Sequence, residues 1–187
     1  NELPVSIKPT HSKKVTKYNI HHAKEKHQQL VLFNDTKTEY PREKTLVNLF
    51  EEQVKTNGTK VAVIFEAKKL TYDQLNKLAN KVAWSLLKEG VKKETLVPIF
   101  IERSAEMLIG MLGILKAGAA YVPIDPEYPA DRITFMLEDT AATLIISSKK
   151  SHAKLPASAK VNVIEIDIDN STLSDLPVNN PSVDIIS

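Results

Sequence analysis

The sequence predicts an α/β fold in which helices alternate with the strands of a mostly parallel sheet. From about residue 41 onward, segments with apolar residues at helical spacing alternate with short runs rich in β-branched residues. This alternation is typical of βα units, whose strands run parallel. The composition agrees, because 42% hydrophobic and 26% charged residues are close to the averages of globular chains. The 187 residues are enough for one ordinary domain or for part of a larger one.

The first 40 residues differ from the rest of the chain. They contain four of the five histidines, several lysines and two prolines, and they show no sustained periodicity. We interpret residues 1–40 as a linker or docking segment and residues 41–187 as the folded unit. The apolar run 30–33, which directly precedes the turn signal Asn34-Asp35, is a candidate anchor for a neighbouring surface.

The folded unit is expected to begin with a helix and two strands. The helix starts after Pro41, and Asn57-Gly58 marks its end. The five-residue apolar run 61–65 is rich in β-branched residues and predicts a buried strand. A polar turn over 66–69 leads into a short second strand at Lys69 and Leu70.

The next helix, which starts at Thr71, is the clearest element of the sequence. Thr71 and Gln74 have the spacing of a capping box, and Gly90 ends the helix. Apolar residues at helical spacing define its core face: Leu75, Leu78, Ala79, Val82, Ala83, Leu86 and Leu87. The opposite face is expected to contact solvent: Asn76, Lys77, Asn80, Lys81 and Lys88.

A strand and another helix follow. The segment 96–101 is almost entirely apolar, and Pro98 within it favours an edge strand or a bulge over the centre of the sheet. Ser104 is a suitable N-cap for the helix. Gly110 and Gly113 each lower the helix propensity by about 1 kcal/mol relative to alanine, so we expect another backbone to pass close by.

The remainder continues the alternation. The prolines of segment 123–129 require an extended or turned backbone, and Pro129 begins a helix that runs to about Glu138. Two further strands are predicted at 144–147 and 161–168, joined by a polar loop.

The motifs of several reaction classes are missing from the sequence. Without cysteine there is no disulfide, thiolate metal site or cysteine nucleophile. The five glycines never cluster into a phosphate-binding loop, and no GxSxG nucleophile motif occurs. His11, His21, His22 and His152 lack the spacing of metal ligands or of a catalytic set. We therefore assign no catalytic, cofactor-binding, substrate-binding or metal-binding residue from the sequence.

The net charge and the hydropathy of the sequence indicate whether nucleic acid or a membrane is an expected partner. A net charge of +2 gives no strong field that would gather nucleic acid or anionic lipid. No stretch approaches the ~18 consecutive apolar residues that a membrane span needs, and the N-terminus lacks the pattern of a signal peptide. We expect neither nucleic acid nor a membrane as a partner, and a cytoplasmic location.

The most specific segment is residues 115–129, which read LKAGAAYVPIDPEYP and are followed by Arg132-Ile133. This segment closely resembles the second core motif of the adenylation domains of nonribosomal peptide synthetases. Residues 70–75, LTYDQL, are similar to the first core motif and depart from it only at Gln74, where the family usually has glutamate.

Further similarity lies upstream. The segments 33–36, 40–41 and 49–53 are similar to the linker and first helix that join a condensation domain to an adenylation domain. The resemblance therefore covers about residue 25 to the end of the sequence, and it implies part of the large N-terminal subdomain of an adenylate-forming enzyme.

The resemblance also implies an activity for the complete domain. The family joins an amino acid to ATP, which gives an aminoacyl adenylate and pyrophosphate, and then transfers the acyl group to a carrier-protein thiol. It implies ATP and Mg²⁺ as cofactors, and as partners the remainder of the domain, an upstream condensation domain and a downstream carrier protein. In the family, the phosphate loop, specificity pocket and catalytic lysine come later in the chain, so we expect this chain to stop before the phosphate loop and to be inactive alone.

The motif residues also have structural explanations. Tyr121 and Tyr128 are large enough to fill space between elements. Lys116 and Arg132 are expected to approach Asp125 as exposed ion pairs. We therefore expect a scaffold role for the motif and no direct ligand contact.

Two other hypotheses remain open from the sequence. One is a non-catalytic interaction module or split half that folds with a complementary chain. The other is part of a standalone acyl or aryl acid ligase, against which the linker-like segments argue. An uncovered sheet edge and apolar faces predict that the chain associates in isolation, which light scattering would reveal.

Overall fold

The computed structural model describes residues 23–168 and 173–183, and the chain divides into two units, residues 1–41 and 42–187. In the first unit, helix α1 (Ala23–Leu30) precedes the 3-10 helix η2 (Leu32–Asn34). The sequence pattern did not predict α1. The Asn34 side chain donates to the carbonyl oxygens of Gln29 and Leu30, at 2.8 and 3.3 Å, and so caps the end of this helix. The apolar run 30–33 is exposed, and its predicted contact with a neighbour is untested.

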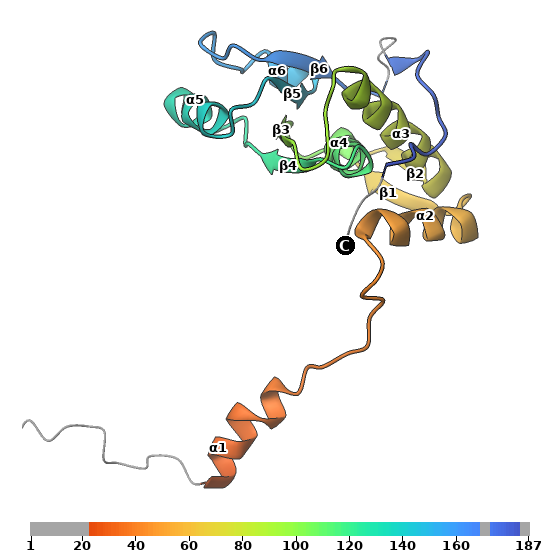
Figure 1. The fold of residues 1–187 in the computed structure, drawn as a ribbon, viewed down its shortest axis with the longest axis vertical. Helices are drawn as coiled ribbons and strands as arrows, with labels where there is room; N and C mark the ends of the chain where they lie inside the picture. Colours follow the sequence, from red (N-terminus) through yellow and green to blue (C-terminus); the bar gives the residue numbers. More distant parts are fainter. Residues whose placement is uncertain (1–22, 169–172, 184–187) are drawn as a thin grey trace, which may run out of the picture. The chain divides into compact units, whose positions relative to one another are not determined.

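The second unit is an α/β structure built on a four-stranded sheet with the strand order β4-β3-β5-β6 (Figure 1). All three strand pairs are parallel, which confirms the predicted fold class. The strands are β3 (Leu96–Phe100), β4 (Ala120–Pro123), β5 (Leu144–Ser147) and β6 (Asn162–Glu165). The helices are α2 (Leu46–Asn57), α3 (Tyr72–Lys88), α4 (Ala105–Lys116), α5 (Ala130–Asp139) and α6 (Lys149–His152).

Most predicted boundaries in this unit hold within a few residues. Pro129 is the N-cap of α5 rather than its first residue. The last strand is shorter than predicted, because β6 spans four residues of the expected 161–168. The short helix α6 was not predicted, and it lies in the polar segment that was expected to be a loop.

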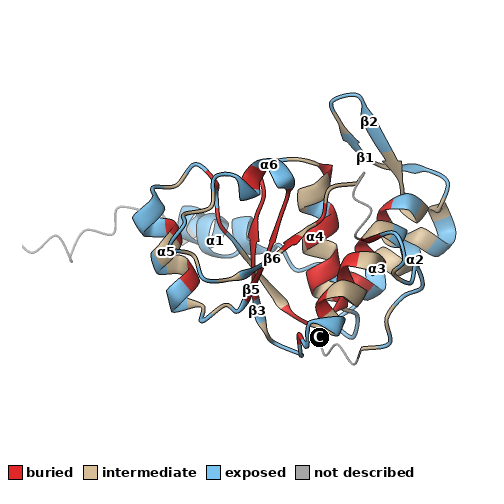
Figure 2. Ribbon diagram, turned by 90° about the horizontal axis from the view of Figure 1, so that it is seen from above, coloured by how far each residue is buried: buried red, intermediate tan, exposed pale blue. Residues whose placement is uncertain are grey.

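The core lies on both faces of the sheet, because side chains alternate along each strand. Ile99 and Ile146 belong to the larger cluster, which packs against α3 and α4. Phe100 and Ile145, one residue away, belong to a second cluster that packs against α5. In Figure 2 most of β3, all of β5 and parts of α3 and α4 are coloured as buried.

The predicted buried strand 61–65 is exposed on one side. It forms β1 (Val61–Phe65), which pairs antiparallel with β2 (Lys68–Thr71) in a separate two-stranded sheet. Ile64 is 64% exposed, whereas Ala62 and Val63 pack against the larger core cluster. A hairpin that rests on helices at one face buries only part of its apolar residues. An unbroken apolar run therefore did not indicate burial on both sides.

The prediction that Pro98 marks an edge strand is wrong, since β3 lies between β4 and β5. The missing N–H is tolerated because β3 pairs with β5 only at Ile99 and Phe100, beyond the proline. On the other side of β3, the carbonyl oxygens of Thr95 and Ile99 accept bonds from β4 and the residue after it. The backbone N–H and C=O groups of the odd-numbered residues of β3 thus point toward β4. Pro98 is even-numbered, so its nitrogen is not needed for a hydrogen bond between these two strands.

The capping box predicted for Thr71 and Gln74 at the start of α3 is confirmed. The Gln74 N–H donates to Thr71 Oγ1 at 3.2 Å, and the Thr71 N–H donates to Gln74 Oε1 at 2.9 Å. The predicted solvent face of α3 is wrong at Asn80, which is fully buried, and Asn76 and Lys81 on the same face are only partly exposed. Residues 173–183 cross this face of α3, and the Asn80 side chain donates to the carbonyl oxygen of Val178 at 2.6 Å.

The two glycines inside α4 mark close contacts. A Cβ at Gly113 would lie 2.5 Å from Val82 Cγ1 and 3.1 Å from the Ala79 carbonyl oxygen of α3. At Gly110 it would lie 2.7 Å from Ile99 Cδ1 of the sheet. The expected close backbone is present at Gly113, whereas side chains restrict the space at Gly110.

Candidate functional site

The strand order places a crevice at the carboxyl ends of β3 and β5. The chain leaves β3 through α4 to reach β4 on one side, and the strands β5 and β6 lie on the other side. Ligands of open parallel sheets bind at such a switch point, outside the carboxyl ends of the strands. The residues after these two strands are therefore the first candidates for a functional site.

A cleft of about 330 Å³ lies at this position. Its polar lining comes from the segments that follow β3, β5 and β6 and from the turn of the β1–β2 hairpin. The charged lining residues are Glu66, Glu102, Arg103, Glu106, Lys150 and Asp167. Acidic and basic groups are mixed, so the cleft has no uniform charge that would select an anion or a cation.

Glu102 is the centre of an ion-pair cluster at the edge of the cleft. Lys150 Nζ lies 2.5 Å from one of its carboxylate oxygens, and Lys154 Nζ lies 2.7 Å from the other. The hydrogen bonds from Lys150 and then from Lys154 hold the pKa of Glu102 at about 2, below its usual 4.5. Lys154 also binds Glu127, and its hydrogen bonds to Glu102 and Glu127 raise its pKa above the usual 10.5.

Hydroxyl and amide groups connect the same segments. Ser151 Oγ accepts from the Glu102 N–H at 3.2 Å, and Ser147 Oγ donates to the Phe100 carbonyl oxygen at 2.8 Å. The Lys149 N–H donates to Asp167 Oδ2 at 2.8 Å. These groups bind one another, so the cluster ties together the ends of three strands. Within residues 23–168 and 173–183, no group of three or more His, Cys, Asp or Glu side chains is placed to hold a metal ion.

The second polar cluster surrounds Lys116, and it corrects a prediction. Lys116 was expected to form an exposed ion pair with Asp125, but its side chain is fully buried and its ammonium binds Glu51 of α2. Burial lowers the pKa of Lys116, against the opposing effect of its hydrogen bond to Glu51. Asp125 Oδ1 instead accepts from the backbone N–H of Glu127 at 2.9 Å.

Arg132 also differs from its predicted ion pair with Asp125. Its guanidinium carbon lies 4.3 Å from the ring centroid of Tyr128, a cation–π contact between α5 and the segment that precedes it. Tyr128 packs against the core cluster of α5, which agrees with its predicted role of filling space.

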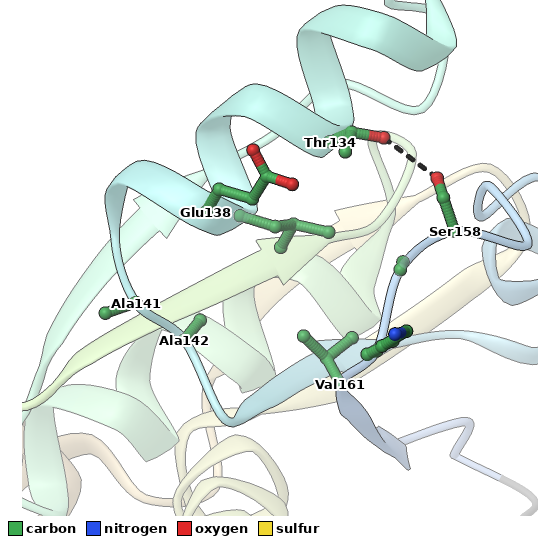
Figure 3. Close-up of a pocket in the computed structure, with 9 residues that line it drawn as sticks. Thr134, Glu138, Ala141, Ala142, Ser158 and Val161 are labelled. Atoms are coloured by element: carbon green, nitrogen blue, oxygen red, sulfur yellow. Dashed lines mark hydrogen bonds between the residues drawn. The ribbon is translucent and has the colours of Figure 1, made fainter.

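Other hollows lie among the described residues of this unit. Figure 3 shows a pocket between α5 and residues 158–161, with a volume of about 320 Å³. In this pocket the hydroxyl groups of Thr134 and Ser158 are hydrogen-bonded, with their oxygens 3.1 Å apart. A second hollow of about 340 Å³ includes His152, whose Nδ1 lies 2.7 Å from Glu165 Oε1. The third, of about 290 Å³, is an almost entirely apolar groove between α2, α3 and α4.

The structure thus shows polar residues that the sequence pattern could not pair. Glu51 and Lys116 are 65 positions apart, and Glu102 and Lys150 are 48 apart. The one available signal was the lysine inside the motif 115–129, at the last turn of a mostly apolar helix. In the part of the chain that the structure describes, no helix is long and apolar enough to cross a membrane.

Comparison with known proteins gives a family. The profile of the family described as AMP-binding enzyme matches residues 50–183. The chain is 50% identical over 123 residues to bacitracin synthase 2 of Bacillus licheniformis. The matched region covers 66% of this chain and 5% of that protein. It is 43% identical over 164 residues to gramicidin S synthase 2 of Brevibacillus brevis, which covers 86% of this chain and 4% of that protein.

Solved structures agree. The nonribosomal peptide synthetase FmoA3 has a TM-score of 0.72 at 28% identity, over 80% of this chain and 16% of that chain. The form of FmoA3 described as bound to AMPPNP has a TM-score of 0.70 at 30% identity, over 79% of this chain and 16% of that chain. The chain spans only about 5% of the length of the curated relatives that it matches.

Proposed function

Because the chain belongs to the family of AMP-binding enzymes and is part of the adenylation domain of a nonribosomal peptide synthetase, we propose that it serves as a scaffold in that domain. The reaction of the complete domain would join an amino acid to ATP, release pyrophosphate, and transfer the aminoacyl group from the adenylate to a carrier-protein thiol. The residues described here would support this chemistry and would not perform it.

The convergence of three segments carries the proposal. The segments 49–53, 70–75 and 115–129 are far apart in the sequence, yet they meet around one apolar groove. The residues that they contribute to its lining are Phe50, Tyr72, Leu75, Leu115 and Tyr121. The Phe50 and Tyr72 rings lie 6.2 Å apart, and Glu51 binds Lys116 beside them. The residues that distinguish the family in this chain therefore pack against one another, as a scaffold requires.

The described residues do not fit ATP or Mg²⁺. A phosphate cradle needs a glycine-rich loop with free backbone N–H groups. The glycines here lie at helix ends or inside α4, where an added Cβ would meet neighbouring side chains. The carboxylates Glu102 and Asp167 of the crevice are already bound, by lysines and by a backbone N–H. We therefore assign ATP and Mg²⁺ to the remainder of the complete domain and derive no step through them.

The partners follow from the same proposal. Residues 1–40 would form the linker to an upstream condensation domain, and residues 41–187 the N-terminal part of the adenylation domain. A carrier protein would receive the acyl group, and the synthetase would act in the cytoplasm in the biosynthesis of a secondary metabolite. Bacitracin synthase 2, gramicidin S synthase 2 and the nonribosomal peptide synthetase FmoA3, to which the chain is similar, support this assignment.

ATP–pyrophosphate exchange with each of the twenty amino acids tests the proposal. The assay compares this chain with the same chain extended through its downstream coding sequence. We expect exchange only in the extended protein, which would also identify the amino acid. Exchange by the chain alone would refute the scaffold role. Exchange by neither protein would favour a non-catalytic interaction module.

A further inference from the structure

Residues 173–183, which we call the strap, cross the outer side of α3 without joining a sheet. Side chains of α3 hold the strap by donating to its carbonyl oxygens. The bonds are Asn80 to Val178 at 2.6 Å, Trp84 to Asn179 at 2.9 Å, and Lys81 to Ser174 at 3.1 Å. Leu173 is buried at one end of the strap, and Val178 in its middle is 47% exposed. Leu176 also packs against the larger core cluster, whereas residues 178–180 are exposed and are held by these polar contacts.

Asn180 is the hub of these contacts. Its Oδ1 accepts from Asn80 Nδ2 at 2.9 Å, from Asn76 Nδ2 at 3.1 Å and from Lys116 Nζ at 3.4 Å. Asn76 and Asn80 are neighbours on α3, whereas Lys116 is the last residue of α4. One side-chain oxygen thus connects the strap to two helices at once.

Lys116 brings a buried positive charge to this hub. Its side chain is fully buried, Glu51 of α2 neutralises it, and its ammonium lies 5.8 Å from the centre of the Phe50 ring. The C-terminal turn of α4 also favours a cation, because the helix dipole is negative there. The ammonium group has three N–H donors, so it can donate to Asn180 of the strap as well as to Glu51.

Gly118 supplies a second contact from the same motif. Its φ of +78° favours glycine, and a Cβ there would lie 2.9 Å from Val183 Cγ1 of the strap. Gly118 lies two residues after Lys116, and the absence of a side chain there leaves room for Val183 at the far end of the strap.

We propose that residues 115–118 form a seat for the strap, and that the buried Lys116 is the latch that holds Asn180 in this seat. The proposal gives the lysine and the glycine of the motif one shared task, which is to fix residues 178–183 against α3 and α4. It does not depend on the proposed adenylation activity. The competing account is that burial of Leu173 and Leu176 holds the strap and that Lys116 only fills the core.

Limited thermolysin digestion of the full chain distinguishes these accounts. Thermolysin cleaves before large aliphatic residues, and mass spectrometry would follow cleavage at Ser182–Val183. Cleavage of a segment that opens and closes rapidly follows the population of its open form. In Lys116→Met we expect cleavage to be about tenfold faster, because a charge-assisted hydrogen bond contributes about the 1.4 kcal/mol that equals a factor of ten.

Two variants control this experiment. Asn180→Ala removes the hub without altering the core, so it should reproduce the faster cleavage even if Lys116→Met folds poorly. Lys81→Met removes the same type of side chain from the same strap, but its bond to Ser174 is exposed. Exposed charges contribute little, so cleavage of Lys81→Met should change by no more than about twofold.

The single tryptophan gives an independent readout. Trp84 is the only tryptophan of the chain, and its indole N–H donates to the strap. In Lys116→Met and Asn180→Ala, acrylamide should quench its fluorescence more strongly while circular dichroism stays unchanged. Unchanged cleavage and quenching in a folded Lys116→Met variant would overturn the latch, even if Asn180→Ala accelerates cleavage, because Asn180 also accepts from Asn76 and Asn80. So would equal acceleration in Lys81→Met.

Discussion

Replacing Glu51 with leucine should destabilise the second unit far more than replacing its partner Lys116 with methionine. The reason is the unequal burial of the two side chains, since that of Lys116 is 0% exposed and that of Glu51 is 22% exposed. Glu51→Leu leaves a buried cation without its counter-ion, which costs about 3–5 kcal/mol in comparable pairs. Lys116→Met leaves a carboxylate that still reaches water, so we expect a cost of about 1 kcal/mol.

Deprotonation sets an upper limit to the cost of Glu51→Leu. A stranded ammonium can release its proton, and at pH 7 this costs about 4.8 kcal/mol for a group with an ordinary pKa of 10.5. The limit falls by about 1.4 kcal/mol for each pH unit, to about 1.4 kcal/mol at pH 9.5. The sign follows from linkage. The folded pKa of Lys116 lies below the unfolded value, so the unfolded state binds more protons and stability rises with pH toward 10.5.

Urea unfolding followed by circular dichroism at pH 7 and pH 9.5 measures these differences. The double variant Glu51→Leu, Lys116→Met removes both charges and should be more stable than Glu51→Leu alone. Equal costs for the two single variants would refute the argument from unequal burial. A cost of Glu51→Leu that does not shrink at the higher pH would show that Lys116 is not a buried charge.

Three further predictions concern packing, capping and the crevice. Gly113→Ala should destabilise the unit by about 1–3 kcal/mol despite its better helix propensity, since its Cβ would lie 2.5 Å from Val82 Cγ1, and Val82→Ala should relieve this cost in urea unfolding. Thr71→Ala should lower the thermal midpoint through a loss of about 1 kcal/mol, whereas Thr71→Ser should retain the cap. Glu102 has its pKa lowered from 4.5 to about 2, so it stabilises the fold above pH 4.5 and this contribution is lost as the pH falls toward 2. The difference in urea midpoint between the wild type and Glu102→Gln should therefore narrow over that range, and a constant difference would contradict the assignment.

Local rules predicted the elements well, because each boundary is set by residues close together in the sequence. The capping box of Thr71 and Gln74 and the N-cap at Ser104 both occur as expected. Neither depends on what the helix packs against. The same holds for the helix end at Gly90, which has the positive φ that glycine favours.

Local rules failed where a distant segment decides the environment. Asn80 lies on the polar face of α3 by periodicity, but the strap covers it and supplies its acceptors. Pro98 argues against a central strand, but the short pairing of β3 with β5 begins beyond it. In both cases the deciding partner lies more than forty residues away, so no window of sequence contains it.

The helix α4 shows why a strongly apolar segment gives little information about its own orientation. Most residues of α4 are large and apolar, yet its buried positions include small ones: Ala105, Gly110 and Gly113, with Ile109 and Ile114. Several of the large residues instead line the apolar groove toward α2, and Leu108 among them is 43% exposed. When apolar residues surround most of a helix, hydrophobic periodicity cannot choose a face. The small residues can, because they alone let α4 approach both the sheet and α3 closely, as the short distances at Gly110 and Gly113 show. In a helix of this kind, the positions of glycine and alanine are therefore a better guide to the buried face than the positions of leucine and methionine.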